Sequence, residues 1–576
     1  MKRKTIIILS LIFSLCILFK FLKQDNKSSG VMSKEVIVPT QAYDDTSITL
    51  AWLKMNNYKE ISGYNIYMNG KLIANTDNNS SSHSEAKSLI NRFYKENRDD
   101  KTVKIATHTC TVAGLKPNTM YKFYISAVNS YGKELTKSNT LIQHTSKAPK
   151  IFNIVSYGAV GDGKTLDTKA IQAAVNACTS GGEVLIPQGK VFKSGSLFLK
   201  SNMIFKVDGK LLGSESTEDY ANVSHNALIN AAGNKKAENL KIIGTGVIDG
   251  NGWKQSTADA ETGFPDSLKS SIKTVSKEGI LAASQYNLGK NKGFSDIKAY
   301  SHRSNLIDIS HIDDVYFGDG LSFENPAQHT IVINHCNDVV LNNALIKTFD
   351  CNNGDGIDFD SEGLTVLNSV FDTGDDDINF TAGRGEEAEK KRSPVRNVWI
   401  FNNYFGRGHG AVTAGSNTAA WIENVLAEDN VLDGTGAGLR CKTAEGTGGG
   451  ARNITFRDSA LKDITDGEGE PFIFTSAYSN SNTDVKYKPA HDLPQFKDIY
   501  VSNCSVDGSK GSAVFVLGLK GACHENIHFQ DVFFRGTKPA EIRYMKNSTF
   551  KNVTFDSSIK DPWNISDSMD VTINKK

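Results

Sequence analysis

Seven related decapeptides decide the fold of this chain: NDVVLNNALI (337–346), EGLTVLNSVF (362–371), RNVWIFNNYF (396–405), ENVLAEDNVL (423–432), RNITFRDSAL (452–461), KDIYVSNCSV (497–506) and ENIHFQDVFF (525–534). Position three is always aliphatic: Val339, Leu364, Val398, Val425, Ile454, Ile499 and Ile527. Position seven is always Asn or Asp: Asn343, Asn368, Asn402, Asp429, Asp458, Asn503 and Asp531. Position ten is always apolar: Ile346, Phe371, Phe405, Leu432, Leu461, Val506 and Phe534. Successive units start 25, 34, 27, 29, 45 and 28 residues apart.

Short strands with a turn residue at a fixed offset, repeated at this period, predict a solenoid. Asn and Asp suit the corners because they tolerate the left-handed backbone conformation. The repeats contain no helix and no leucine-rich consensus, so we expect an all-β, right-handed parallel β-helix over residues 150–576. The inward apolar positions of successive coils then stack into one core. The amphipathic segment DTKAIQAAVNAC (167–178) predicts a helix that caps its N-terminal end.

Residues 33–148 read as a separate small β-sandwich. Apolar and polar residues alternate around Trp52, Ile66 and Phe123, and Asn69-Gly70 predicts a hairpin turn. The stretch GLKPNTMYKFYISAVNSYGKE (114–134) resembles the fibronectin type III family, with Tyr121 as the corner tyrosine and Trp52 in the core. Residues 76–108 would be an insertion between its strands. We expect a spacer or packing module rather than a sugar-binding one.

The N-terminus and the composition narrow the class of protein. Basic residues at 2–4 precede the apolar run IIILSLIFSLCILF (6–19), so residues 1–27 predict a signal peptide or an N-terminal anchor, and export. A net charge of +1 without long runs of one sign disfavours nucleic-acid and membrane-surface binding. Eight cysteines without a CxxC pair favour neither zinc nor a dense disulfide scaffold, and their spacing leaves any pairing open.

Ionisable side chains follow four consecutive repeats at similar offsets. Counted from position three of each unit, Asp355 is at +16, Asp375 and Asp376 at +11 and +12, His409 at +11, and Arg440 and Lys442 at +15 and +17. Neighbouring coils lie about 4.8 Å apart, so these side chains should form a ladder on one flank of the solenoid.

This ladder favours glycoside cleavage of an acidic sugar. Three nearby carboxylates repel one another, so the pKa of at least one should rise. A proton-holding acid beside ionised carboxylates is what glycoside cleavage needs. Arg440 and Lys442 would face one side of a strand and bind an anionic sugar. Each motif alone is typical of turns, calcium sites or solvated surfaces, and the common phase favours a joint function.

The ordered motifs NxDG (353–356), GDD (374–376), GHG (408–410) and RxK (440–442) resemble glycoside hydrolase family 28, the polygalacturonases. Further stretches, such as SGSLFLKSNMIFKVDGKLLGS (194–214) and GTGVIDGNGW (244–253), extend the resemblance over residues 150–556. Two positions depart from the family. Gly354 replaces the usual Thr, and Asp377 replaces the usual Cys after the Asp pair.

The resemblance implies hydrolysis of α-1,4-galacturonosidic bonds in polygalacturonate with inversion of configuration. Asp375 would be the general acid, Asp355 and Asp376 would activate the water, and His409 would tune the protonation of the acid. Arg440, Lys442 and Asn353 would bind substrate. Inversion predicts carboxyl groups roughly 6.5–9.5 Å apart. We expect no cofactor, no metal, and polygalacturonate or oligogalacturonides as the partner of a monomer.

Three insertions predict that the enzyme works from chain ends. They are residues 254–300, FTAGRGEEAEKKRSPV (380–395) and TDGEGEPFIFTSAYSNSNTDVKYKPAHD (465–492). Long loops at the rim of a scaffold commonly shape the site, and Arg384, Lys390, Lys391 and Arg392 would suit a terminal uronate. The pairing with a fibronectin-like module resembles bacterial exo-polygalacturonases, which implies release of mono- or digalacturonate. The alternatives are a calcium-dependent pectate lyase and a non-catalytic β-helix adhesin.

Overall fold

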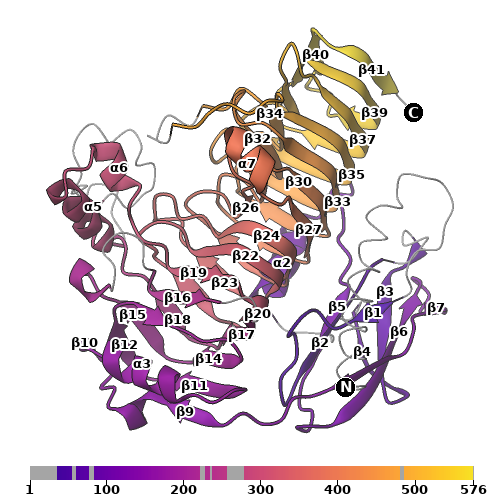
Figure 1. Ribbon diagram of the computed structural model, residues 1–576. Helices are drawn as coiled ribbons and strands as arrows, with labels where there is room; N and C mark the ends of the chain where they lie inside the picture. Colours follow the sequence, from indigo (N-terminus) through magenta and orange to yellow (C-terminus); the bar gives the residue numbers. More distant parts are fainter. Residues whose placement is uncertain are drawn as a thin grey trace.

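The computed structural model describes residues 35–54, 60–76, 84–220, 227–233, 237–255, 278–479 and 486–574. Figure 1 shows a long stack of short strands beside a smaller sandwich that contains the N-terminal strands. The stack is a parallel β-helix, and all its strand pairings between coils are parallel. This confirms the predicted architecture.

The strands of the β-helix stack in three sheets. The flank sheet contains β9 (Ile151–Asn153), β11 (Gly182–Ile186), β14 (Met203–Val207), β17 (Glu238–Ile243), β20 (Asp313–Gly318), β27 (Val395–Phe401), β30 (Ile422–Glu428) and β41 (Met569–Asn574). The edge sheet contains β10 (Asp162–Leu166), β12 (Val191–Ser194), β15 (Lys210–Gly213), β18 (Val247–Asp249), β21 (Ser322–Glu324), β23 (Leu345–Lys347), β25 (Val370–Asp372), β28 (Tyr404–Phe405) and β31 (Val431–Asp433).

The site sheet, which carries the predicted chemistry, contains β13 (Leu197–Phe198), β16 (Ile229–Ala232), β19 (Ile307–Ser310), β26 (Ile378–Phe380), β29 (Val412–Ala414), β32 (Leu439–Lys442), β34 (Phe472–Thr475), β36 (Phe515–Leu517), β38 (Ala540–Arg543) and β40 (Trp563–Ser566). Two long strands, β22 (Ile331–Asn342) and β24 (Ile357–Leu367), bend from the site sheet into the flank sheet. Four others, β33 (Gly450–Ile464), β35 (Gln495–Ser509), β37 (His524–Arg535) and β39 (Met545–Phe555), bend from the flank sheet into the edge sheet.

The repeat pattern is explained by backbone geometry. All seven Asx residues at position seven have φ between 49° and 56°, the left-handed conformation that these residues tolerate and that turns the chain at the coil corner. The apolar residues at positions three and ten are all buried in one continuous core. Position two is a second left-handed corner that the sequence analysis did not identify, filled by Asp338, Gly363, Asn397, Asn424, Asn453, Asp498 and Asn526.

Helices close one end of the β-helix and flank its side. Helix α3 (Thr168–Ala177) buries Ile171, Ala174 and Val175 against the first coils, as predicted for the cap. The insertion after β18 forms α5 (Leu281–Asn291) and α6 (Asp296–Tyr300), which project from the solenoid at the left of Figure 1. The insertion after β26 forms α7 (Gly385–Lys391).

The N-terminal module is a two-sheet sandwich. One sheet contains β1 (Val36–Ile37), β2 (Ile48–Trp52) and β5 (Thr109–Val112), and the other contains β3 (Gly63–Met68), β4 (Lys71–Asn75), β6 (Met120–Val128), β7 (Glu134–Lys137) and β8 (Leu141–His144). Trp52 is buried against Tyr64, and the Tyr121 hydroxyl accepts a hydrogen bond from Lys116 N at 2.9 Å. Asn69 and Gly70 form the predicted hairpin turn, both at positive φ. Helix α2 (Glu85–Glu96) lies in the predicted insertion.

The module packs against the β-helix through apolar side chains. Ala42 and Ala51 of the sandwich join a cluster on the outer face of the flank sheet that includes Trp399 and Phe401. Helix α2 packs on the outer face of the edge sheet through a second cluster: Ala86, Ile90, Phe93, Val370, Tyr404, Val431 and Ala460. The module therefore covers two of the three sheets and leaves the site sheet open.

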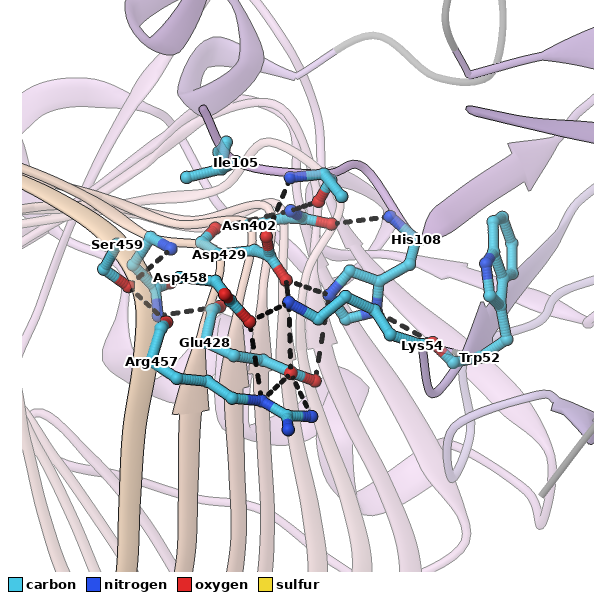
Figure 2. Close-up of polar contacts among 12 residues, drawn as sticks. Trp52, Lys54, Ile105, His108, Asn402, Glu428, Asp429, Arg457, Asp458 and Ser459 are labelled. Carbon is cyan, nitrogen blue, oxygen red and sulfur yellow. Dashed lines mark hydrogen bonds and ion pairs between the residues drawn. The ribbon is translucent and has the colours of Figure 1, made fainter. Parts of the chain in front are cut away.

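A buried group of charges joins the same two parts (Figure 2). This docking cluster consists of Lys54, His108, Glu428, Asp429, Arg457 and Asp458. Lys54 Nζ lies 2.7 Å from Asp429 Oδ2, 3.6 Å from Glu428 Oε2, and bonds to Asp458. His108 Nδ1 donates to the Trp52 carbonyl at 2.8 Å, and its Nε2 lies 3.3 Å from Asp429. Asp429 and Asp458 are position-seven residues, so residues at the coil corners also bind the N-terminal module.

The predicted signal peptide or anchor, residues 1–27, lies outside the described residues. Within the described part of the chain, no helix has the length and apolar character needed to cross a membrane. The seven cysteines described are free thiols.

Candidate active site

The predicted site residues lie together on four consecutive coils. Asp355, Asp375 and His409 lie in loops that lead from the edge sheet into the site sheet, just before β24, β26 and β29. Arg440 and Lys442 lie within β32, on the next coil. Strands β24, β26, β29 and β32 pair in this order in parallel, and this pairing brings the side chains into one ladder.

Asp376 is the most firmly held carboxylate of the site. Its side chain accepts hydrogen bonds from Thr413 Oγ1 at 2.9 Å, Arg440 Nη1 at 2.9 Å and Lys442 Nζ at 2.6 Å. Burial by itself would raise its pKa, but the two cations lower it. Asp376 is therefore ionised, and the two predicted substrate cations are bound to it in this structure.

Asp375 is paired with an imidazole. Its Oδ1 lies 3.0 Å from His409 Nδ1, and its Oδ2 accepts a hydrogen bond from Asn353 Nδ2 at 3.3 Å. Burial would raise the pKa of Asp375, but the neighbouring His409, Lys442 and Arg440 hold it well below its usual range. The Asp375 charge in turn raises the pKa of His409 to about 9.

Asp355 is paired with a second imidazole, which the sequence analysis missed. His329 Nδ1 lies 2.9 Å from Asp355 Oδ1 and 3.3 Å from Asp358 Oδ2. Burial raises the pKa of Asp355 to about 8, although His329 opposes this rise. One carboxyl pKa rises as expected, but its main cause is burial, with repulsion from Asp375 and Asp358 contributing less. The rise falls on Asp355 rather than on Asp375, the expected acid.

The spacing of the carboxyls differs from the expectation. One oxygen each of Asp355, Asp375 and Asp376 lies within 4.8 Å of the other two. These nearest oxygens are closer together than the roughly 6.5–9.5 Å expected between the carboxyl groups as a whole. The three groups fit this closely because each has its own cationic neighbour: His329 for Asp355, His409 for Asp375, and the Arg440–Lys442 pair for Asp376.

The two departures from the family motifs have structural consequences. A Cβ at Gly354 would lie 2.8 Å from the Cys351 carbonyl oxygen, so the tight turn requires glycine. Asp377 is fully buried and accepts hydrogen bonds from Thr373 Oγ1 at 2.8 Å and Thr435 Oγ1 at 3.2 Å. Burial raises its pKa well above the usual range. Asp377 therefore supports the loop from behind, and its carboxyl is not open to substrate.

Further residues around the site lie in the insertions or, for Arg303, directly after one. Glu468 Oε1 binds the second edge of the Arg440 guanidinium at 2.5 Å. The Tyr478 ring lies 5.1 Å from Lys442 Nζ. Arg303, fully buried before β19, donates to Asn353 Oδ1 at 2.7 Å. No shared phase marks these residues in the sequence, because insertions do not follow the repeat.

The insertion loops brace one another beside the site. Glu386 pairs with Lys488 at 2.5 Å, and its backbone N–H donates to the Lys488 carbonyl at 3.0 Å. Lys390 and Lys391 pair with glutamates of α7, and Arg392 pairs with Asp360. Three of the four cations expected to meet a terminal uronate are thus bound to protein carboxylates. Arg384, half-buried and hydrogen-bonded to Asn417, is the remaining candidate.

One sheet of this parallel β-helix carries three adjacent carboxyls, two imidazoles and two further cations. This combination is typical of β-helix enzymes that cleave polysaccharides. Comparisons with known proteins give the family. Residues 178–559 match the Glycosyl hydrolases family 28, and residues 36–144 match the Fibronectin type III domain. This chain belongs to glycosyl hydrolase family 28, with a fibronectin type III domain ahead of the hydrolase domain.

Two exo-acting relatives match nearly the whole chain, and an endo-acting relative matches a little more than half of it. The chain is 39% identical to the exo-poly-alpha-D-galacturonosidase of Dickeya chrysanthemi, over 94% of this chain and 93% of that one. It is 26% identical to the endo-polygalacturonase of Pectobacterium carotovorum subsp. carotovorum, over 58% of this chain and 75% of that one. The solved family 28 exopolygalacturonase of Yersinia enterocolitica superposes with a TM-score of 0.86 at 37% identity, covering 94% of this chain and 99% of that one.

Proposed function

We propose that this protein hydrolyses the α-1,4-galacturonosidic bonds of polygalacturonate, and that it does so from chain ends. The observation that carries the proposal is the trio of Asp355, Asp375 and Asp376, each beside its own cation, on a family 28 scaffold. Support comes from the two exo-acting relatives, which match more than nine tenths of the chain including the N-terminal module.

The proposed reaction adds one water across the glycosidic bond. The proton for the leaving oxygen comes from the His409 imidazolium, because the pKa of Asp375 lies well below its usual range and that of His409 is raised to about 9. It passes through the Asp375 carboxylate, whose Oδ1 lies 3.0 Å from His409 Nδ1. Asp355 takes the proton of the attacking water. It is a stronger base than Asp376, because burial raises the pKa of Asp355 while Arg440 and Lys442 lower that of Asp376. Asp376 holds the two cations where the uronate carboxylate binds.

Inversion of configuration is part of the proposal and rests on the family resemblance. The nearest oxygens of the three carboxyls lie within 4.8 Å of one another, and inverting enzymes commonly hold the two carboxyl groups roughly 6.5–9.5 Å apart to admit a water. Proton NMR of the first product decides this point. Initial release of the β-anomer from the α-linked polymer means inversion, and initial release of the α-anomer means retention.

The chain-end mode is supported by the braced insertion loops. Helix α7 is tied to residues 486–492 by Glu386–Lys488 and by Glu389, which accepts the backbone N–H of His491 at 3.1 Å. Walls of this kind turn a groove into a pocket for one or two terminal residues. We also propose export, which the basic and apolar N-terminal segment supports, and activity as a monomer without a metal.

Digestion of polygalacturonate, with and without a chelator, tests the proposal. We expect reducing ends to appear in both conditions, without the ultraviolet absorbance of unsaturated products. We further expect viscosity to fall slowly while mono- or digalacturonate appears from the first minutes. Loss of activity with the chelator together with ultraviolet-absorbing products would identify a lyase. Viscosity collapse after a few per cent of bonds are cut would refute the chain-end mode, and absence of any product would refute the function.

A further inference from the structure

His329 and Asp358 form a pair directly behind the carboxyl of Asp355. His329 lies in the turn before β22, and Asp358 is the second residue of β24. The imidazole Nδ1 is within 3.3 Å of both carboxylates, and it is closer to Asp355, at 2.9 Å, than to Asp358. Because one N–H donates to one acceptor at a time at full strength, the two carboxylates compete for this proton.

The competition leaves Asp358 incompletely satisfied. Its Oδ1 accepts a hydrogen bond from Asn379 Nδ2 at 2.9 Å. Its Oδ2, which faces His329, is buried and has no hydrogen-bond partner among the described residues. A buried carboxylate oxygen without a donor is costly, so Asp358 keeps the imidazole charged. Asp358 and Asp355 together raise the pKa of His329 to about 10, despite its burial.

Other charges face this pair from every neighbouring element. From β19 comes Asp308, whose pKa is itself raised by burial. From the segment before β19 comes Arg303, whose charge interacts with Asp355. From the loop before β26 come Asp375 and Asp376. In this surrounding, His329 is the cation hydrogen-bonded to Asp355, whereas Arg303 reaches the same loop through Asn353.

We propose that His329 is a positioning residue that orients Asp355 and favours its ionised form, and that Asp358 sets how much of the imidazole charge Asp355 receives. The inference rests on the proposed function, in which Asp355 accepts a proton from water. The His329–Asp358 pair thus holds the base, Asp355, in the same way as His409 holds the acid, Asp375.

The pair predicts opposite effects for two substitutions. His329→Gln removes the cation beside Asp355, so the acidic limb of the pH profile of kcat/KM moves to higher pH by about one unit or more. Asp358→Asn removes a competing anion, so the same limb moves to lower pH by about half a unit or more. In His329→Gln, kcat falls at least about tenfold at the optimum of the wild type while KM changes little.

The experiment measures full pH profiles of polygalacturonate hydrolysis for the wild type, both variants and His335→Gln. His335 lies on the same strand, β22, and is exposed, and its ring lies 5.1 Å from that of His311, tilted by 44°. It should behave as the wild type. Thermal unfolding of each variant separates a loss of folded protein from a change in mechanism, because a lower folded fraction scales the profile without moving its limbs.

The outcomes are distinct. Opposite shifts of the two variants support the proposal. Shifts in the same direction, or unchanged limbs in folded variants, overturn it. If the wild type and His335→Gln release no galacturonate product, the proposed function fails instead. NMR titration of the His329 ring still tests the pair in that case: Asp358→Asn should lower its pKa, and an unchanged value refutes the coupling.

Discussion

At the residue scale, the Asx residues at position seven serve two purposes. Their left-handed backbone turns each coil, which the sequence pattern predicted. The side chains of three successive corners, Asn402, Asp429 and Asp458, also receive the N-terminal module. The second role was not predictable, because it depends on residues nearly 300 or more positions away. His329 was missed for a related reason, since it lies outside the motifs and meets Asp355 only through coil stacking.

The roles of the two paired carboxyls are separable by substrate chemistry. We expect Asp375→Asn to lower kcat on polygalacturonate by at least about 10²-fold, because its amide has no proton to give. With aryl α-glycosides of mono- and digalacturonate that carry a good leaving group, the variant should regain most activity, since such groups leave without protonation. Asp355→Asn should be poorly active on both substrates.

The two carboxyls could have the opposite roles, and the same substrates would show this. The raised pKa of Asp355 would suit a general acid in the free protein. If Asp355→Asn is rescued by the aryl substrates and Asp375→Asn is not, the two roles are reversed. Initial rates on matched concentrations of the polymer and the aryl substrates distinguish these results.

At the element scale, regular and irregular segments differed in how well the sequence predicted them. The β-helix strands and the cap α3 follow period and amphipathicity, so their place was predictable. The insertions follow neither. We expected Lys390, Lys391 and Arg392 to contact the substrate. In helix α7, however, Lys390 and Lys391 each pair with a glutamate one turn earlier. The same helix instead braces the second insertion, which is a contact between loops about a hundred residues apart.

Removal of this brace should change the mode of cleavage. We expect replacement of α7, residues 385–391, by a short Gly-Ser linker to open the wall, because Glu386 and Glu389 would no longer hold residues 488–492. Viscosity of polygalacturonate should then fall several-fold faster per bond cut than with the wild type. The variant leaves Arg384 and Arg392 in place.

A matched control uses the exposed pair at one end of the same helix. Lys391 and Glu387 are largely exposed and pair only with each other along α7 in the described contacts, so Glu387→Ala should leave the ratio of viscosity to reducing ends unchanged. Equal ratios in the wild type and the linker variant would show that α7 does not form the wall.

At the scale of the whole molecule, the N-terminal module and the β-helix share buried surface. The sequence indicated a sandwich and a solenoid, and it favoured a packing role for the first. It did not indicate which face is covered, because flank-sheet residues such as Trp399 and Phe401 read as ordinary repeat positions. The module packs on the flank and edge sheets, so we expect it to affect activity by supporting the coils that carry Asp375, His409 and Arg440.

The docking cluster makes this support testable. Lys54 is almost fully buried and faces three carboxylates, which raise its pKa although burial alone would lower it. We expect Lys54→Met to lower the free energy of unfolding by about 3–5 kcal/mol, because it removes a buried cation that lies against Glu428, Asp429 and Asp458. Thermal unfolding measures the loss, with Lys122→Met, an exposed lysine of the same module, as the control.

The decrease in the free energy of unfolding caused by Lys54→Met should depend on pH, because folding changes the pKa of Glu428. The pKa of Glu428 is lowered in the folded protein: burial opposes ionisation, but Arg457, Lys54 and His108 outweigh it. A carboxyl with a lowered folded pKa stabilises the protein above its unfolded pKa of about 4.3, and this contribution is lost as the pH falls toward the folded value. The difference between wild type and Lys54→Met should therefore be full near pH 7 and shrink below about pH 4. A difference no larger than that of Lys122→Met at pH 7 would show that the charges do not hold the module, and that the apolar contacts of Trp399, Phe401 and α2 suffice.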